Sequence, residues 1–203
     1  MESYYIEPVQ PVLRRFVEDF RNIVAREAAG SARLDALRAP VEALLGDASW
    51  ITEEFLVPVP ATTATWSVYR SQEPDLCIFT MVVPPLNSTK VHNHLTDGWV
   101  GLVQGEQLER HFQRLDDGSR PGFADVRQTE EHPIHLGEIT PIQYPGADIH
   151  QIVTASREPS VSLHVLFNDL GTVERQTFEP AAQTATNFVS GYTNVDGASV
   201  IGR

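Results

Sequence analysis

Between residues 65 and 167 the sequence repeats one pattern: short apolar or alternating runs, each followed by turn-forming residues. The runs cover residues 65–70, 76–83, 99–104, 107–115, 123–129, 138–144, 149–155 and 161–167. Several of them are separated by the turn segments DDGSRPG, YPGAD and SREPS. This spacing of short strands indicates an antiparallel sandwich or barrel, because alternating βαβ units would need a helix between successive strands.

Two amphipathic segments come before these runs. Within residues 11–26, apolar side chains recur at helical spacing at Leu13, Phe16, Val17, Phe20 and Ile23. In the second segment the apolar residues lie on one side of the expected helix: Leu34, Leu37, Val41, Leu44 and Leu45. Its pattern is interrupted at Pro40 and stops at Gly46, a residue suited to a helix C-cap. We expect both helices to cover one face of the strands from outside.

The length of 203 residues fits a single domain with a core of useful size. We divide it into a helical part at residues 1–60, a barrel at 61–175 and a C-terminal tail at 176–203. The tail is small and polar with isolated aromatics. Its composition leaves open whether it is an ordered wrap or a frayed end.

The charge balance limits the classes of partner. There are 27 acidic and 15 basic side chains, giving a net charge of −12, which disfavours binding to nucleic acid and to anionic membranes. The single cysteine, Cys77, lies in an apolar run and is expected to be buried. Neither a signal peptide nor a bilayer-spanning run is apparent, so we expect a cytoplasmic protein, as a monomer or small homo-oligomer.

Three histidines form the most informative pattern. In TKVHNHLTDGWVGLVQG, His92 and His94 are two residues apart, so on a strand their rings face the same way, about 7 Å apart. An H-x-H pair alone is a weak signal. Gly105 follows eleven residues after His94, however, and YPGADIHQIV later presents P-G-x-x-x-H, which ends on His150.

This two-part arrangement resembles that of the cupins, in which the second motif brings a third ligand across the barrel. The resemblance implies a mainly β, double-stranded β-helix (jelly-roll) barrel with the N-terminal helices packed on its outside. Many cupins also carry a glutamate four or five residues after the second histidine, where this chain has Gly98 and Trp99. A three-histidine site leaves the charge of Fe(II) uncompensated and favours an anionic ligand such as a thiolate.

That ligand set resembles the thiol dioxygenases, the group of cysteine dioxygenase and 3-mercaptopropionate dioxygenase. VSLHVLF is similar to the family's Ser-x-His-x-Tyr stretch, which implies catalytic roles beside the metal for Ser162 and His164. Leu166 stands where the family has tyrosine, and Gly98 where animal cysteine dioxygenases have the cross-linked cysteine. The match is therefore nearer to the bacterial 3-mercaptopropionate type.

Two arginines are candidates for binding a substrate carboxylate. In the bacterial type this arginine lies nine residues after the tyrosine position, which is Arg175 here, in GTVERQTF. Cysteine dioxygenases instead use an arginine upstream of the first histidine in a Tyr-x-Arg setting, which Arg70 matches in VYRSQ, with a shorter spacing. A structural or solvated role is the alternative for either side chain.

The resemblance implies that Fe(II) binds a small thiol and dioxygen, and that both oxygen atoms are added to sulfur to give a sulfinate. Leu166 and Trp99 suggest a substrate pocket altered toward a larger thiol or thione such as ergothioneine, although burial in the core is the usual role of tryptophan. Two alternatives stay open: a non-catalytic small-molecule-binding cupin, and a cupin enzyme that uses another metal.

The other histidines carry less information. His111 lies in LERHFQRL among charged neighbours and is expected to be exposed. His132 and His135 flank a proline in EHPIHLG. Because the H-x-x-H spacing directs the two rings to opposite faces of a strand, we expect no second metal site from this pair.

Overall fold

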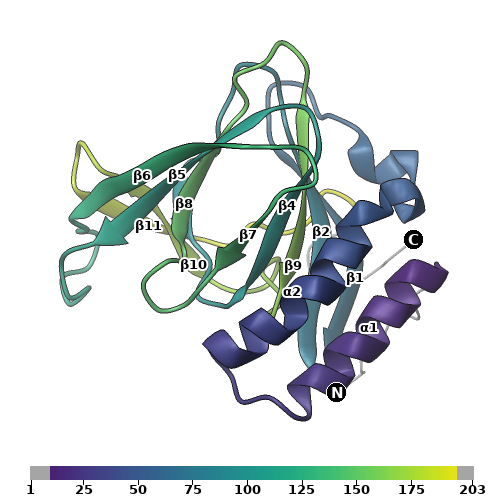
Figure 1. Cartoon of the computed structure of the whole chain (residues 1–203). Helices are drawn as coiled ribbons and strands as arrows, with labels where there is room; N and C mark the ends of the chain where they lie inside the picture. The colour runs from purple at the N-terminus through teal and green to yellow at the C-terminus, as the bar shows by residue number, and fades with distance from the viewer. Residues whose placement is uncertain (1–9, 196–203) are drawn as a thin grey trace.

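The computed structural model describes residues 10–195, which form two α-helices, two short 3-10 helices and eleven strands (Figure 1). The helices are α1 (Pro11–Val24), α2 (Ser31–Gly46), η1 (Ala48–Trp50) and η2 (Glu53–Leu56). The strands are β1 (Ala64–Gln72), β2 (Asp75–Val83), β3 (Val91–Asn93), β4 (Gly98–Gln104), β5 (Gln107–Arg114), β6 (Val126–Ile134), β7 (Ile139–Ile142), β8 (Ile149–Val153), β9 (Ser160–Leu166), β10 (Arg175–Glu179) and β11 (Thr184–Phe188).

The strands form two antiparallel sheets, in the orders β1-β2-β9-β4-β7 and β11-β10-β3-β8-β5-β6. Between β2 and β9 the chain crosses from one sheet to the other at every connection except the β5–β6 hairpin. The resulting half-sheets, β2-β9-β4-β7 and β3-β8-β5-β6, have the interleaved order of a jelly roll. The predicted mainly β, double-stranded β-helix fold is confirmed.

Both long helices pack on the outer face of the five-stranded sheet (Figure 1). The buried helix residues meet sheet residues such as Ile78, Trp99 and Leu163. The predicted interruption at Pro40 is wrong, since α2 runs unbroken through it. The burial of neighbouring helix residues outweighs the backbone hydrogen bond that proline cannot make. Neither helix has the length and hydropathy needed to cross a bilayer, within the described part of the chain.

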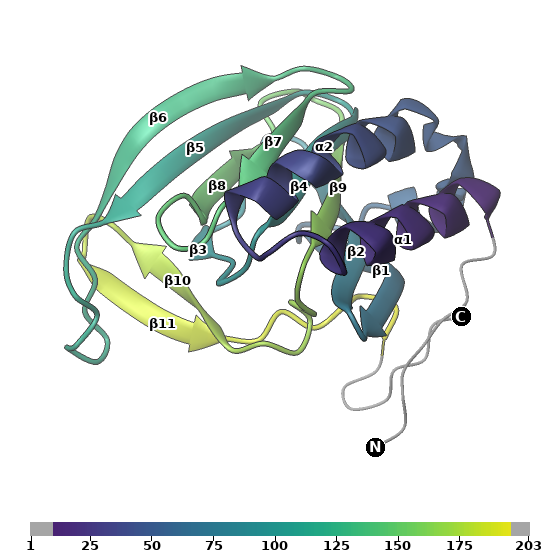
Figure 2. The ribbon, with the colours of Figure 1, turned by 60° about the horizontal axis from the view of Figure 1, so that its bottom comes forward.

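Residues 176–195, the described part of the predicted tail, have a defined structure. Strands β10 and β11 form a hairpin, and β10 pairs with β3, with Thr177 opposite His92 (Figure 2). The six-stranded sheet therefore extends past the boundary predicted for the barrel. Residues 196–203 of the predicted tail, and residues 1–9 of the helical part, lie outside the described residues.

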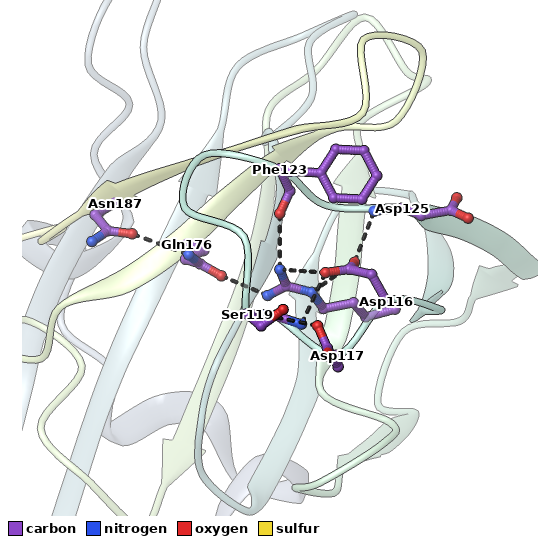
Figure 3. A network of polar contacts seen from close by, with 9 residues as sticks. Asp116, Asp117, Ser119, Phe123, Asp125, Gln176 and Asn187 are labelled. Atoms are coloured by element: carbon purple, nitrogen blue, oxygen red, sulfur yellow. Dashed lines mark hydrogen bonds and ion pairs between the residues drawn. The ribbon is translucent and has the colours of Figure 1, made fainter.

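A polar network fixes the connection between β5 and β6 to this added hairpin (Figure 3). Arg114 donates to both carboxylate oxygens of Asp116, to the Phe123 carbonyl and to the Gln176 side-chain oxygen. Gln176 in turn donates to Asn187 on β11. The network joins β5, β10 and β11, so it supports the sheet on which the metal-binding candidates lie.

Candidate metal centre

The structure brings the three predicted ligands together inside the barrel. His92 on β3 is the register partner of His150 on β8, so the two side chains share one face of the sheet. His94 follows directly after β3. The ring centroids are 4.9, 4.9 and 4.7 Å apart, and one nitrogen of each ring lies within 4.8 Å of the others. All three residues are buried.

Backbone carbonyls set the orientation of the first two rings. His92 Nδ1 donates to the Lys90 carbonyl at 2.9 Å, and His94 Nδ1 donates to the Asp148 carbonyl at 3.0 Å. A carbonyl oxygen only accepts, so each ring carries its proton on Nδ1 when neutral, and Nε2 is left with a lone pair. Burial, followed by the nearby His150, holds the pKa of both rings well below the usual value. Both imidazoles are therefore neutral, as metal ligation requires.

The third ring is held by a carboxylate. His150 Nδ1 lies 2.5 Å from Oε1 of Glu109, and both side chains are buried. His150 Nε2 is buried and has no hydrogen-bond partner among the described residues. A buried polar atom without a partner is costly, and a metal ion would satisfy it. The donor set thus fits a metal, with three Nε2 atoms inward and every Nδ1 fixed from outside.

The ligand group contains no carboxylate: among residues 10–195, these three histidines alone form this cluster of possible ligands. Glu109 approaches only the outer nitrogen of His150. Burial raises the cost of ionising Glu109, but its contacts with His111 and His150 outweigh this, so its pKa is lowered. An anion therefore stands behind His150 and raises the basicity of that imidazole.

A cavity of about 30 Å³ is lined by two of the three histidines, His92 and His94. Its polar walls include His164 and Arg175, and its apolar walls include Phe79, Met81 and Leu170. The segment after β11 contributes Ser190 and Tyr192 to the same wall. The cavity therefore has imidazole, guanidinium and apolar groups around one space.

Ser162 and His164 lie on the inward face of β9, as strand alternation requires. Ser162 Oγ and His164 Nε2 are hydrogen-bonded at 3.0 Å, and the ring stacks on Phe79 with centroids 4.6 Å apart. Burial, with a smaller contribution from His150, lowers the pKa of His164 to about 3. His164 Nδ1 is buried without a partner in the described chain. A neutral polar group therefore stands beside the cavity.

The two arginines have different environments. Arg175 is buried, donates to the Asn93 carbonyl at 3.0 Å and to Ser190 Oγ at 3.2 Å, and has an Nε without a partner in residues 10–195. No described carboxylate pairs with it. Burial lowers its pKa to about 10, so it keeps its charge at neutral pH. Arg175 borders the cavity, so a buried positive charge stands beside it.

Arg70, the competing candidate, is occupied elsewhere. Its Nε donates to Asp169 at 2.8 Å, its Nη2 forms an ion pair with the same carboxylate, and its guanidinium lies 5.0 Å from the centre of the Tyr192 ring. Arg70 is not among the residues that line the cavity. The structure therefore assigns it a partner within the fold and leaves Arg175 as the cation at the site.

Three other predicted substrate contacts are also absent from the cavity wall. Trp99 points outward under α2, where its Nε1 donates to the Leu34 carbonyl at 3.1 Å. Leu166 is fully buried in the barrel core. Gly98 packs so closely on β9 that an added Cβ would lie 2.4 Å from both Leu166 and the Val165 carbonyl. These three positions serve packing rather than a cavity contact.

Glu109 and Tyr192 are among the residues at the site that were not predicted from sequence. Glu109 lies in a charged run typical of an exposed strand, and only the pairing of β5 with β8 brings it to His150. Tyr192 enters from the tail, with its hydroxyl donating to Asp169 at 2.8 Å. The isolated aromatics of the tail were the one available signal for an ordered contact.

Comparison with known proteins gives distant structural matches. No protein-family model matches the sequence. Solved structures that are similar include a protein from Thermus thermophilus (20% identity, 57% of this chain and 92% of that one, TM-score 0.43). Others are an uncharacterised double-stranded β-helix protein from Klebsiella pneumoniae (14%, 57% and 84%, TM-score 0.41) and a cupin-superfamily protein from Desulfitobacterium hafniense (14%, 61% and 88%, TM-score 0.41). The strand order itself, rather than these distant matches, establishes the fold.

Proposed function

We propose that this protein is an iron-dependent thiol dioxygenase that converts a small thiol and O2 into a sulfinate. The observation that carries the proposal is the combination of three imidazole ligands, no carboxylate ligand, and one buried arginine without a carboxylate partner among residues 10–195. A ligand set that contains no carboxylate favours an anionic substrate donor such as a thiolate. The arginine beside it suits a substrate that carries an acid group.

Bound Fe(II) would supply the position at which sulfur and dioxygen are held together and exchange electrons. The chain's own residues provide placement. Arg175 binds the substrate carboxylate and fixes its distance from the three histidines, because its position is held by Asn93 and Ser190. His164, oriented by Ser162, presents a neutral polar edge toward the cavity.

The walls of the cavity shield the site from water. Phe79, Met81 and Leu170 form apolar walls, and Tyr192 covers the same space from the tail. Such walls exclude water and strengthen the charge interactions inside the cavity. In the overall reaction the thiol proton leaves and both oxygen atoms end on sulfur, which supplies the electrons, so no external reductant is needed.

The lining of the cavity supports a short thiol acid over a larger thione such as ergothioneine. Arg175, His92 and His94 border the same cavity, so the acid group and the sulfur of a bound substrate would be held close together. Leu166 and Trp99, the residues that suggested a larger substrate, do not border it. We therefore propose 3-mercaptopropionate or a thiol acid of similar length as the substrate.

The test is a substrate panel on protein loaded anaerobically with Fe(II), with oxygen uptake and sulfinate measured together. We expect 3-mercaptopropionate to raise oxygen uptake well above that of its amide, which lacks the carboxylate. Arg175→Gln should abolish this preference through a higher KM and leave the iron content unchanged. A matched control is Arg15→Gln, on the exposed face of α1.

Two outcomes would reject the proposal in favour of the alternatives. If no thiol raises oxygen uptake in iron-loaded protein, a non-catalytic binding protein is the better account. If protein produced without added metal retains Zn, Ni or Mn and fails to oxidise thiols after exchange for iron, a cupin enzyme with another metal is favoured, since imidazoles accept most first-row metals.

A further inference from the structure

A second cluster of metal-ligand side chains lies next to the first on the same sheet. His111 on β5 is the register partner of His150, so the two rings share a face. Glu109 is two residues before His111 and is the register partner of His132 on β6. Strand pairing therefore directs Glu109, His111 and His132 to one common point, unlike the H-x-x-H pair considered from sequence.

The distances within this cluster are those of ligands around one ion. Glu109 Oε2 lies 3.5 Å from His111 Nε2 and 3.7 Å from His132 Nε2, and all three possible ligand atoms lie within 4.8 Å of one another. These separations are too long for good hydrogen bonds. Ligands about 2.0–2.2 Å from a tetrahedral metal lie roughly 3.3–3.6 Å apart. The two rings are stacked, with centroids 5.3 Å apart and planes at 7°.

An unpartnered oxygen provides a second, independent observation. Glu109 is 1% exposed; its Oε1 is used by His150, and its Oε2 has no hydrogen-bond partner within residues 10–195. A buried carboxylate oxygen without a donor is costly, so a cation is required near it. The candidates are a proton on His111, whose pKa is raised by contact with Glu109, or a metal ion shared by both imidazoles.

We propose that Glu109, His111 and His132 bind a second divalent first-row cation, for which Zn²⁺ is the appropriate probe. Two imidazoles, one carboxylate and a position left for water form a common zinc donor set. The cluster is reachable from solvent, because the His111 side chain is 20% exposed and that of His132 is 35% exposed. A metal ion bound there would also satisfy the buried Oε2 of Glu109.

The shared carboxylate gives the second ion a consequence for the first site. Glu109 contacts His150 through Oε1 and would bind the second ion through Oε2. A cation on Oε2 draws negative charge away from the His150 contact, which weakens that imidazole as a ligand. Occupancy of the two sites is therefore coupled, and the coupling acts equally in both directions.

The experiment is equilibrium dialysis of metal-free, full-length protein against Zn²⁺ at mildly alkaline pH, with bound metal measured per chain. We expect two Zn²⁺ in the native protein, one in His132→Ala and one in His94→Ala. The control His135→Ala changes an exposed histidine on the turn after β6 and should keep two. Circular dichroism of each metal-free variant checks that it is folded. Alanine should be tolerated at position 132, because the His132 side chain is 35% exposed.

Two results would overturn the second site. One is a native protein that binds a single Zn²⁺, lost in His94→Ala and retained in His132→Ala. The other is that His132→Ala and the double variant His111→Ala/His132→Ala both still bind two Zn²⁺ per chain. Neither result depends on thiol oxidation, so failure of this site and failure of the proposed activity are distinguished.

Discussion

Replacing Glu109 by glutamine tests how far the metal centre depends on the anion behind His150. Glutamine keeps the shape and an oxygen that accepts from Nδ1, but it removes the charge from a contact of 2.5 Å in which both side chains are 1% exposed. A hydrogen bond to a charged group contributes about 1.5–3 kcal/mol. We therefore expect the affinity of the three-histidine site for Fe(II) to fall about 10–100-fold.

The assay is an anaerobic competition titration of Fe(II) against a chelator of known affinity. It should be run in the His132→Ala background as well, so that metal at the second cluster does not contribute to the measured loss. Glu106→Gln is the matched control, because Glu106 is exposed just before the same strand. An affinity for Fe(II) that is the same in Glu109→Gln and in the control would refute the role assigned to this carboxylate.

Three further predictions concern the residues around the site. Arg70→Ala leaves a largely buried Asp169 unpaired and should lower the free energy of unfolding by about 3 kcal/mol in urea titrations; a loss no larger than that of the exposed Arg15→Ala would contradict the pairing. Leu166→Tyr should overpack the core and destabilise it by about 1–3 kcal/mol without altering thiol selectivity, and a changed ranking of thiols would show that Leu166 does reach the substrate. Because the pKa of His164 is lowered to about 3 in the fold, the unfolded chain binds one more proton between that pH and about 6.5. The free energy of unfolding of the metal-free protein therefore falls as pH falls through this window. His164→Gln should reduce the slope of this free energy against pH by about 1.4 kcal/mol per pH unit. Equal slopes in the variant and the native protein would mean that His164 is charged in the fold.

The parts of the site that follow from local chain geometry were predictable. A period of two along a strand places His92 beside His94, and the turn before His150 marks the start of the opposing strand. The same alternation accounts for Trp99. Since Gly98 packs on β9 inside the barrel, the next residue must face out toward α2.

The parts that depend on strand register were not predictable from the sequence. Glu109 and His111 look like exposed strand residues until β5 is paired with β8 and β6. Arg70 and Arg175 were both candidates from the sequence, and only their surroundings separate them, because Asp169 pairs with the first. Tyr192 reaches the cavity from a segment whose composition does not indicate where it will pack.

Isotope-labelled dioxygen provides the most direct measurement of the central claim. Iron-loaded protein and 3-mercaptopropionate are mixed with heavy-oxygen O2, and the product is analysed by mass spectrometry, with His94→Ala as the inactive control. We predict a sulfinate carrying both heavy oxygen atoms, formed only by the protein that retains all three histidines. A product with one heavy atom or none, or equal product from the control, would contradict thiol dioxygenation at this site.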